Sequence, residues 1–337
     1  MAGRRDFVST LLARAQVLDF WPRVLPAGLV VLAYHRIVDM GDEREFPCDP
    51  ELVSASVEGF EQQMEFVRSK WNPLSMSALL HAIEHGKRLP PRSALITFDD
   101  GHVDNYTHAF PVLRRLKLPA TVFLSTNYVG GTVQIWFDRI CTLLYFAPAG
   151  QIQLPGLTLQ VALGNVDTRR QAAARALELL KKLPDLERCN VVQQFEAQFG
   201  QYVPFGVATQ PALNWDQVRE MGECGIEFGS HTVSHPILSM LDEESIRREL
   251  AESRAQIERE TGKPCRVLAY PVGKPYAFDD RVKRVARECG YIAALSYTDG
   301  VDDLAAADRF ALKRVSVERY YSHAMFMARM LIPRIFV

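Results

Sequence analysis

The hydrophobic pattern of the chain alternates between two periods. Short apolar runs rich in β-branched residues predict strands at 29–34, 94–98, 120–125, 226–230, 266–270, 291–296 and 311–317. Between several of them, apolar residues recur at helical spacing, most clearly in 242–260, which Gly262 and Pro264 follow as expected at a helix end. This alternation predicts an α/β fold with a mainly parallel sheet, either closed as a barrel or open and doubly wound.

Two segments depart from this alternation. Residues 130–210 contain a helical block at 169–183 and loops with glycine and proline, but few strand-like runs. We therefore expect an inserted, mainly helical segment that lies over the main domain rather than forming a separate one. Residues 1–27 carry apolar side chains at helical spacing and predict an amphipathic helix. The main domain is then expected at residues 28–320, with a tail at 321–337.

Targeting signals are weak. Arg14 and Asp19 interrupt the apolar part of the N-terminal segment, which argues against an export signal, and no run is long and apolar enough to span a bilayer. The N-terminal helix could pack on the domain or make peripheral contact with a membrane surface, and we favour packing. The six scattered cysteines indicate reduced thiols. A cytoplasmic protein, with membrane association left open, is expected.

Composition excludes some partners. The 337 residues are 48% hydrophobic and 23% charged, which allows a large apolar core. The formal net charge is -1 and no dense basic run occurs, so nucleic acid is not an expected partner. The oligomeric state is not encoded in any pattern of the sequence.

Polar clusters follow four of the predicted strands directly. They are His35, the pair Asp99-Asp100, His231, and the run Pro271-Val272-Gly273. The carboxyl ends of parallel strands converge on one face of such a fold, and active sites are built there. We therefore expect these clusters to share one site.

The residue types in these clusters suit metal-assisted hydrolysis. In Thr97-Phe98-Asp99-Asp100-Gly101, one carboxylate can bind a metal while its neighbour acts as a base, although a solvated Asp-Asp-Gly turn is the ordinary alternative. His231 and His235 are four residues apart, so one helical turn would direct both toward one ion. Two imidazoles and a carboxylate would leave coordination positions for water and substrate.

These motifs resemble the polysaccharide deacetylase family, the carbohydrate esterases with a NodB-homology domain. TFDDG followed downstream by HTVSH is similar to the family's paired signatures. The resemblance implies an irregular, partly closed (β/α) barrel of about seven parallel strands. It also implies that Asp99 is the general base and that Asp100, His231 and His235 are the metal ligands.

The third family motif resembles Tyr270-Pro271-Val272-Gly273. The resemblance assigns Tyr270, Pro271 and Val272 to substrate binding, with the Val272 N–H helping to hold the oxyanion. The family's usual arginine in this motif aligns with Ala269, so the base must be positioned by another group.

The family's late leucine–x–x–histidine motif is absent. Leu312-Lys313-Arg314-Val315 stands near its place, and His323 lies beyond the last strand. Ala33-Tyr34-His35-Arg36 instead resembles the N-terminal signature of circularly permuted members, which implies that His35 is the general acid. A structural histidine at a strand end is the alternative.

The resemblance implies a metal-dependent hydrolase that removes N-acetyl groups from an amino-sugar glycan or its lipid-linked precursor. Zinc is the expected cofactor, although cobalt, nickel or iron would accept the same ligands. Hydrolysis of a non-sugar amide, such as a cyclic amide or formamide, and a non-catalytic glycan-binding domain remain alternatives. Trp136, Phe137 and Asp138 begin the insertion, where the aromatic pair could line a sugar cleft or simply be buried.

Overall fold

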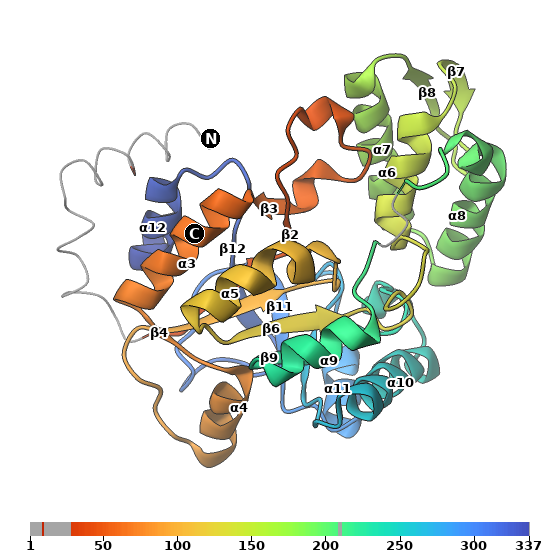
Figure 1. Ribbon diagram of the computed structural model, residues 1–337. Helices are drawn as coiled ribbons and strands as arrows, with labels where there is room; N and C mark the ends of the chain where they lie inside the picture. The colour runs from red at the N-terminus through yellow and green to blue at the C-terminus, as the bar shows by residue number, and fades with distance from the viewer. Residues whose placement is uncertain (1–8, 10–27, 208–210, 337) are drawn as a thin grey trace.

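The computed structural model describes residues 9, 28–207 and 211–336 (Figure 1). The amphipathic helix predicted for residues 1–27 therefore lies outside the described residues, apart from Ser9. Among the helices that the structure describes, none has the length and apolar character needed to cross a bilayer.

Seven parallel strands close into a barrel. They follow one another in the order β1, β12, β11, β10, β9, β6 and β5, and β5 pairs with β1 to complete the circle. Their bounds are β1 Val30–Tyr34, β5 Ser93–Phe98, β6 Ala120–Leu124, β9 Ile226–Ser230, β10 Val267–Ala269, β11 Ala293–Asp299 and β12 Leu312–Ser316. The short β4 (Asn72–Pro73) extends the sheet beside β5. The expected barrel of about seven parallel strands is confirmed, and each predicted strand is present with ends shifted by a few residues.

The barrel strands are apolar along their length because both of their faces are covered. All five residues of β1 and all six of β5 are buried. Side chains on one face fill the barrel, and those on the other pack against the surrounding helices. These helices are α3 Val57–Lys70, α4 Met76–His85, α5 Phe110–Leu116, α9 Trp215–Glu223, α10 Glu243–Thr261 and α11 Asp280–Glu288.

Helix α10 shows how the local sequence sets an element's ends. The Asp242 side chain accepts a hydrogen bond from the Ser245 amide at the first turn. Gly262 then ends the helix in the left-handed conformation, with φ of 66°. The helix predicted for 242–260 is thus found almost unchanged.

The insertion packs around an apolar cluster of its own (Figure 1, yellow and green). It consists of α6 Trp136–Phe146, the antiparallel hairpin of β7 Gly150–Gln153 and β8 Gln160–Leu163, α7 Val166–Leu180, α8 Asp185–Phe199 and the short η5 Gly200–Tyr202. The helical block predicted for 169–183 corresponds to α7. The hairpin was not predicted, because its strands are short and mostly exposed.

The stretch between β1 and α3 makes contact with both the barrel and the insertion. This stretch contains β2 Arg36–Ile37, η2 Glu43–Glu45, η3 Pro50–Leu52 and β3 Val53–Ala55. The Glu43 carboxylate pairs with Arg170 of α7 and with Arg319, which follows β12. One carboxylate thus joins the barrel's last loop to the insertion.

The C-terminal segment forms two helices, α12 His323–Leu331 and α13 Pro333–Phe336. Helix α12 packs against α3, and Phe326 and Leu331 belong to the same apolar core as the barrel. The residues expected to form a tail therefore cover part of the barrel's outer layer.

Candidate active site

The clusters predicted to share a site do so. His35, Asp99, Asp100, His231 and His235 line one cavity of about 350 Å³ beyond the carboxyl ends of the barrel strands. Other cavity residues come from the loops after the strands and from the insertion: Asp49, Glu51, Leu52, Trp136, Phe137, Leu177, Lys181, Tyr270, Val272, Lys274, Tyr276, Tyr297, Glu318 and Tyr320. The insertion therefore forms one wall of this cavity.

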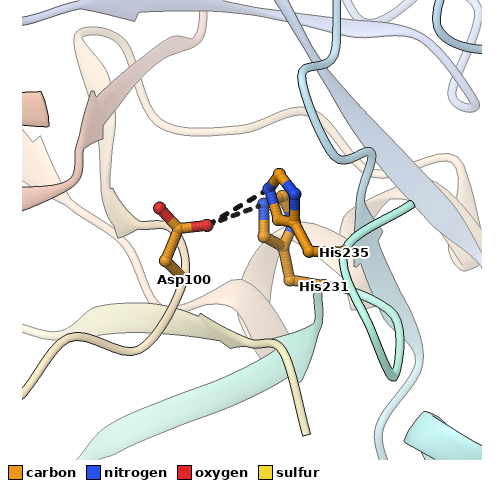
Figure 2. A group of neighbouring side chains, drawn as sticks. All are labelled: Asp100, His231 and His235. Carbon is orange, nitrogen blue, oxygen red and sulfur yellow. Dashed lines mark ion pairs between the residues drawn. The ribbon is translucent and has the colours of Figure 1, made fainter. Parts of the chain in front are cut away.

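Asp100, His231 and His235 form a buried group that suits a metal ion. Figure 2 shows the Asp100 carboxylate directed at both imidazole rings, with Oδ1 lying 3.4 Å from Nε2 of His231 and 3.3 Å from Nε2 of His235. One ligand atom from each residue lies within 4.8 Å of the other two. Oδ1 is buried, and no described residue forms a hydrogen bond with it. Two imidazoles and one carboxylate match the donor set of catalytic zinc sites, so the residues fit a divalent cation.

The Asp100 carboxylate is held ionised. Burial by itself would raise its pKa, but contacts with His102, His231 and His235 lower the pKa well below its ordinary value. His102 Nε2 lies 3.3 Å from the second oxygen, Oδ2, and so fixes the rotation of the carboxylate.

Hydrogen bonding sets the tautomer of His231. Nδ1 lies 2.7 Å from the backbone oxygen of Ala269, a carbonyl that can only accept. Nδ1 therefore carries the proton, and Nε2 presents its lone pair toward Asp100 and any bound cation. Ala269 stands where the family's arginine was expected, and its backbone carbonyl orients the predicted metal ligand His231 instead.

Backbone strain is concentrated at this site. Asp100, Thr232, His235 and Val272 adopt positive φ angles of 73°, 69°, 57° and 61°. Such conformations cost about 1–3 kcal/mol each in non-glycine residues and persist where the surrounding structure enforces them. They direct the side chains that follow β5, β9 and β10 into the cavity.

Asp99 is paired with an arginine that was not predicted. Both terminal nitrogens of Arg314 on β12 donate to the Asp99 carboxylate, at 2.8 Å to Oδ1 and 2.7 Å to Oδ2. The Arg314 Nε–H donates to the Ser296 carbonyl at 2.7 Å, so the guanidinium is itself fixed. Burial would raise the pKa of Asp99, but the charges of Arg314 and His231 lower it below its ordinary value.

Arg314 did leave a signal in the sequence. It lies in the run Leu312-Lys313-Arg314-Val315, near the place of the missing leucine–x–x–histidine motif. Along β12 the exposed Lys313 alternates with the buried Leu312 and Arg314, so the arginine occupies a position that normally holds an apolar side chain. A charge at a buried strand position indicates a paired residue.

His35 faces the same carboxylate from β1. Its Nε2 lies 4.0 Å from Oδ2 of Asp99, and its ring lies 5.3 Å from that of Tyr297. Its backbone amide donates to Ser54 Oγ, and Asn105 Nδ2 donates to its carbonyl. Burial lowers the pKa of His35, although the charges of Asp100 and Asp99 act in the opposite direction.

The late histidine, His323, lies elsewhere. It begins α12, where its ring contacts Phe66 of α3, and it borders a hollow of about 540 Å³ between α3, α5 and α12. That hollow contains none of the predicted site residues.

The third motif contributes two of its four residues to the cavity. Tyr270 and Val272 line it, whereas Pro271 and Gly273 do not. The Tyr270 hydroxyl donates to the Phe310 carbonyl at 2.9 Å, and its ring stacks on Phe278. Tyr270 therefore serves as a rigid wall rather than as a free hydroxyl. Gly273 N donates to Pro271 O at 2.6 Å, which makes a tight turn centred on Val272.

Comparison with known proteins identifies the family of this chain and several of its relatives. The family model described as "Polysaccharide deacetylase" matches residues 86–154 and 164–294, more than half of the chain. YxkH of Bacillus subtilis strain 168 is 21% identical over 306 residues, which cover 90% of this chain and 76% of that protein. The poly-beta-1,6-N-acetyl-D-glucosamine N-deacetylase of Escherichia coli K12 is 29% identical over 137 residues, 40% of this chain but only 19% of that enzyme.

Solved structures share the fold. The Streptococcus pyogenes deacetylase PplD in complex with acetate superimposes with a TM-score of 0.61 at 17% identity, over 92% of this chain and all of that one. IcaB from Ammonifex degensii gives a TM-score of 0.57 at 19% identity, over 91% of this chain and 98% of that one.

Proposed function

Because the chain belongs to the polysaccharide deacetylase family and is a hydrolase of amide bonds, we propose that it removes N-acetyl groups from an amino-sugar glycan with a divalent cation as cofactor. One observation carries the proposal. The buried group of Asp100, His231 and His235 shares a cavity with a carboxylate, Asp99, that is oriented by an arginine and left ionised.

Asp100, His231 and His235 would hold the cation, zinc by preference for this donor set. When bound, the cation supplies Lewis acidity toward the acetyl oxygen and the attacking water. The protein's own groups supply the proton transfers. Asp99 accepts a proton from the attacking water, since its carboxylate is ionised and held in one orientation by Arg314.

The remaining steps use groups on the other strands. The Val272 N–H, in the tight turn after β10, stabilises the oxyanion of the tetrahedral intermediate. His35, whose Nε2 lies 4.0 Å from Oδ2 of Asp99, delivers a proton to the departing amine. The amide bond then breaks to give acetate and a free amino sugar.

The mouth of the cavity favours a glycan. Tyr276 and Tyr320 line it with 59% and 55% of their surface exposed, and they come from the loops after β10 and β12. Exposed aromatic rings with a polar end can pack on the apolar face of a sugar while hydrogen-bonding its hydroxyls. We propose an oligomeric or polymeric N-acetylglucosamine substrate, consistent with the named substrate of the Escherichia coli relative.

Acetate release from N-acetylglucosamine oligomers tests the proposal. We expect release that stops on chelation and returns with zinc, cobalt or nickel, and that is lost in Asp99→Asn while the variant still binds metal. If protein shown to bind zinc releases acetate with none of these metals, the sugar assignment fails. A panel of cyclic amides and formamides then identifies a non-sugar amidohydrolase.

A further inference from the structure

The two proposed histidine ligands are held in different ways. His231 donates its Nδ1–H to the Ala269 carbonyl, as metal-binding histidines usually do to a neighbouring oxygen. Nδ1 of His235 is buried, yet no described residue forms a hydrogen bond with it. The orientation of His235 must therefore depend on contacts to its ring and its backbone.

Those contacts come from the insertion. The indole N–H of Trp136 donates to the backbone oxygen of His235 at 3.1 Å. The Phe137 ring meets the His235 imidazole edge to face, with centroids 5.0 Å apart. Trp136 and Phe137 are the first two residues of α6, so one helix end contacts both the backbone and the ring of the same residue.

The turn that carries His235 needs such support. Thr232 and His235 both have positive φ, and the His235 amide donates to Thr232 Oγ1 at 3.1 Å. On the barrel side, Glu249 of α10 accepts hydrogen bonds from the amides of Val233 and Ser234. On the insertion side, the carbonyl of His235 is held by Trp136. Hydrogen bonds with α10 on one side and with α6 on the other therefore hold the strained turn in place.

Trp136 is itself fixed within the insertion. The Arg188 guanidinium of α8 lies 4.6 Å from the indole centroid, in cation–π contact, and pairs with the Asp185 carboxylate. Trp136 and Phe137 are only 5% and 8% exposed, so their rings offer little free surface for a sugar. The pair is therefore largely buried, although both residues line the cavity.

We propose that Trp136 and Phe137 are positioning residues for the metal ligand His235, which makes the insertion part of the metal site as well as a wall of the cavity. The proposal rests on the proposed function, because it assumes that His235 binds the cation. Groups that orient metal ligands typically change metal affinity by about 10–100-fold when they are removed.

The test measures zinc affinity by competition with a chromogenic chelator, together with the visible absorption spectrum of the cobalt-loaded protein. Trp136→Phe removes the indole N–H that reaches His235. Trp71→Phe is the matched control, since Trp71 is 8% exposed and its buried indole N–H has no hydrogen-bond partner among the described residues. We expect zinc affinity to fall about 10–100-fold in Trp136→Phe and to stay unchanged in Trp71→Phe.

Phe137→Leu supplies a second variant that keeps an apolar side chain but loses the ring against His235. We expect weaker zinc binding and an altered cobalt spectrum here too, and this variant decides the matter if Trp136→Phe does not fold. Wild-type zinc affinity in both insertion variants, or an equal loss in Trp71→Phe, would overturn the proposal. Equal zinc affinity in wild type and His235→Ala would overturn the proposed function itself, and the positioning role with it.

Discussion

Arg314 on β12 and Asp99, which directly follows β5, form a buried bidentate ion pair with N–O distances of 2.8 and 2.7 Å. The planar guanidinium matches both carboxylate oxygens at once, so the pair fixes the direction of the carboxylate as well as its charge. The arginine missing from the third motif, where Ala269 stands, is thus replaced by one from another strand of the barrel. This relationship indicates how Asp99 is kept ready to accept a proton.

Arg314→Lys should lower kcat on the order of 100-fold, because lysine keeps the charge but cannot hold both oxygens in one plane. Arg314→Met should lose more, and the acidic limb of its kcat/KM profile should move to higher pH. The direction follows from the pair: Arg314 lowers the pKa of Asp99, so removing it raises that pKa and the base is protonated at a higher pH.

Arg329→Lys is the matched control for these variants. Arg329 is also buried and pairs with a carboxylate, Asp299, but it does not line the cavity. Its kcat should stay close to that of wild type. An Arg314→Lys variant with wild-type kcat and an unmoved pH profile would contradict the positioning role.

His35→Gln separates the proposed general acid from a structural histidine. An amine is a poor leaving group that needs a proton, so acetate release from N-acetyl sugars should fall about 10²–10⁴-fold. Hydrolysis of 4-nitrophenyl acetate should change little, because nitrophenolate leaves without a proton. Equal losses on both substrates would point to a structural role. His323→Gln, in α12 outside the cavity, should behave as wild type on both.

Glu318 should make the stability of the protein depend on pH. Burial raises the pKa of this cavity carboxyl from its ordinary value of 4.5 to about 7, and the nearby charge of Glu51 adds to the rise. The folded state then binds the proton more tightly than the unfolded state, so the free energy of unfolding falls as the pH rises from about 4.5 to 7. Glu318→Gln replaces the titrating carboxyl by a neutral amide, so the variant should not show this fall in the free energy of unfolding.

Chemical unfolding at pH 5 and pH 8 measures the effect. The variant should gain stability relative to wild type mainly at pH 8, by roughly 3 kcal/mol at most. Glu187→Gln on the exposed surface of α8 controls for the loss of a negative charge, and it should give the same small difference at both pH values. A Glu318→Gln gain of equal size at pH 5 and pH 8 would show that the carboxyl does not titrate in this range.

Tyr276→Ala and Tyr320→Ala test the extended glycan. If each ring packs on a sugar, it contributes about 0.5–1.5 kcal/mol, so KM for an oligomer should rise roughly 2- to 10-fold per variant. In at least one of these two variants, KM for monomeric N-acetylglucosamine should stay unchanged. Tyr202→Ala, also exposed but on η5 outside the cavity, is the control. Unchanged KM for oligomers in both cavity variants would favour a small substrate.

The local sequence determined the strand–helix alternation and the set of candidate metal ligands, Asp100, His231 and His235. Strands buried on both faces must be apolar along their length, so they stand out as runs such as Val30–Tyr34. The spacing of His231 and His235 is short, and one turn after β9 brings both rings to Asp100. Because parallel strands end at a common face, their last residues could be assigned to one site without knowing the strand order.

Only the tertiary structure decided which distant residues complete that site. Arg314 and Asp99 are 215 positions apart and meet because β1 pairs with both β5 and β12 when the barrel closes. Trp136 reaches His235 because the insertion folds back on the barrel across 99 positions. Local periodicity reports whether a residue is buried but not what it faces, since that depends on the register and packing of elements far apart in the chain.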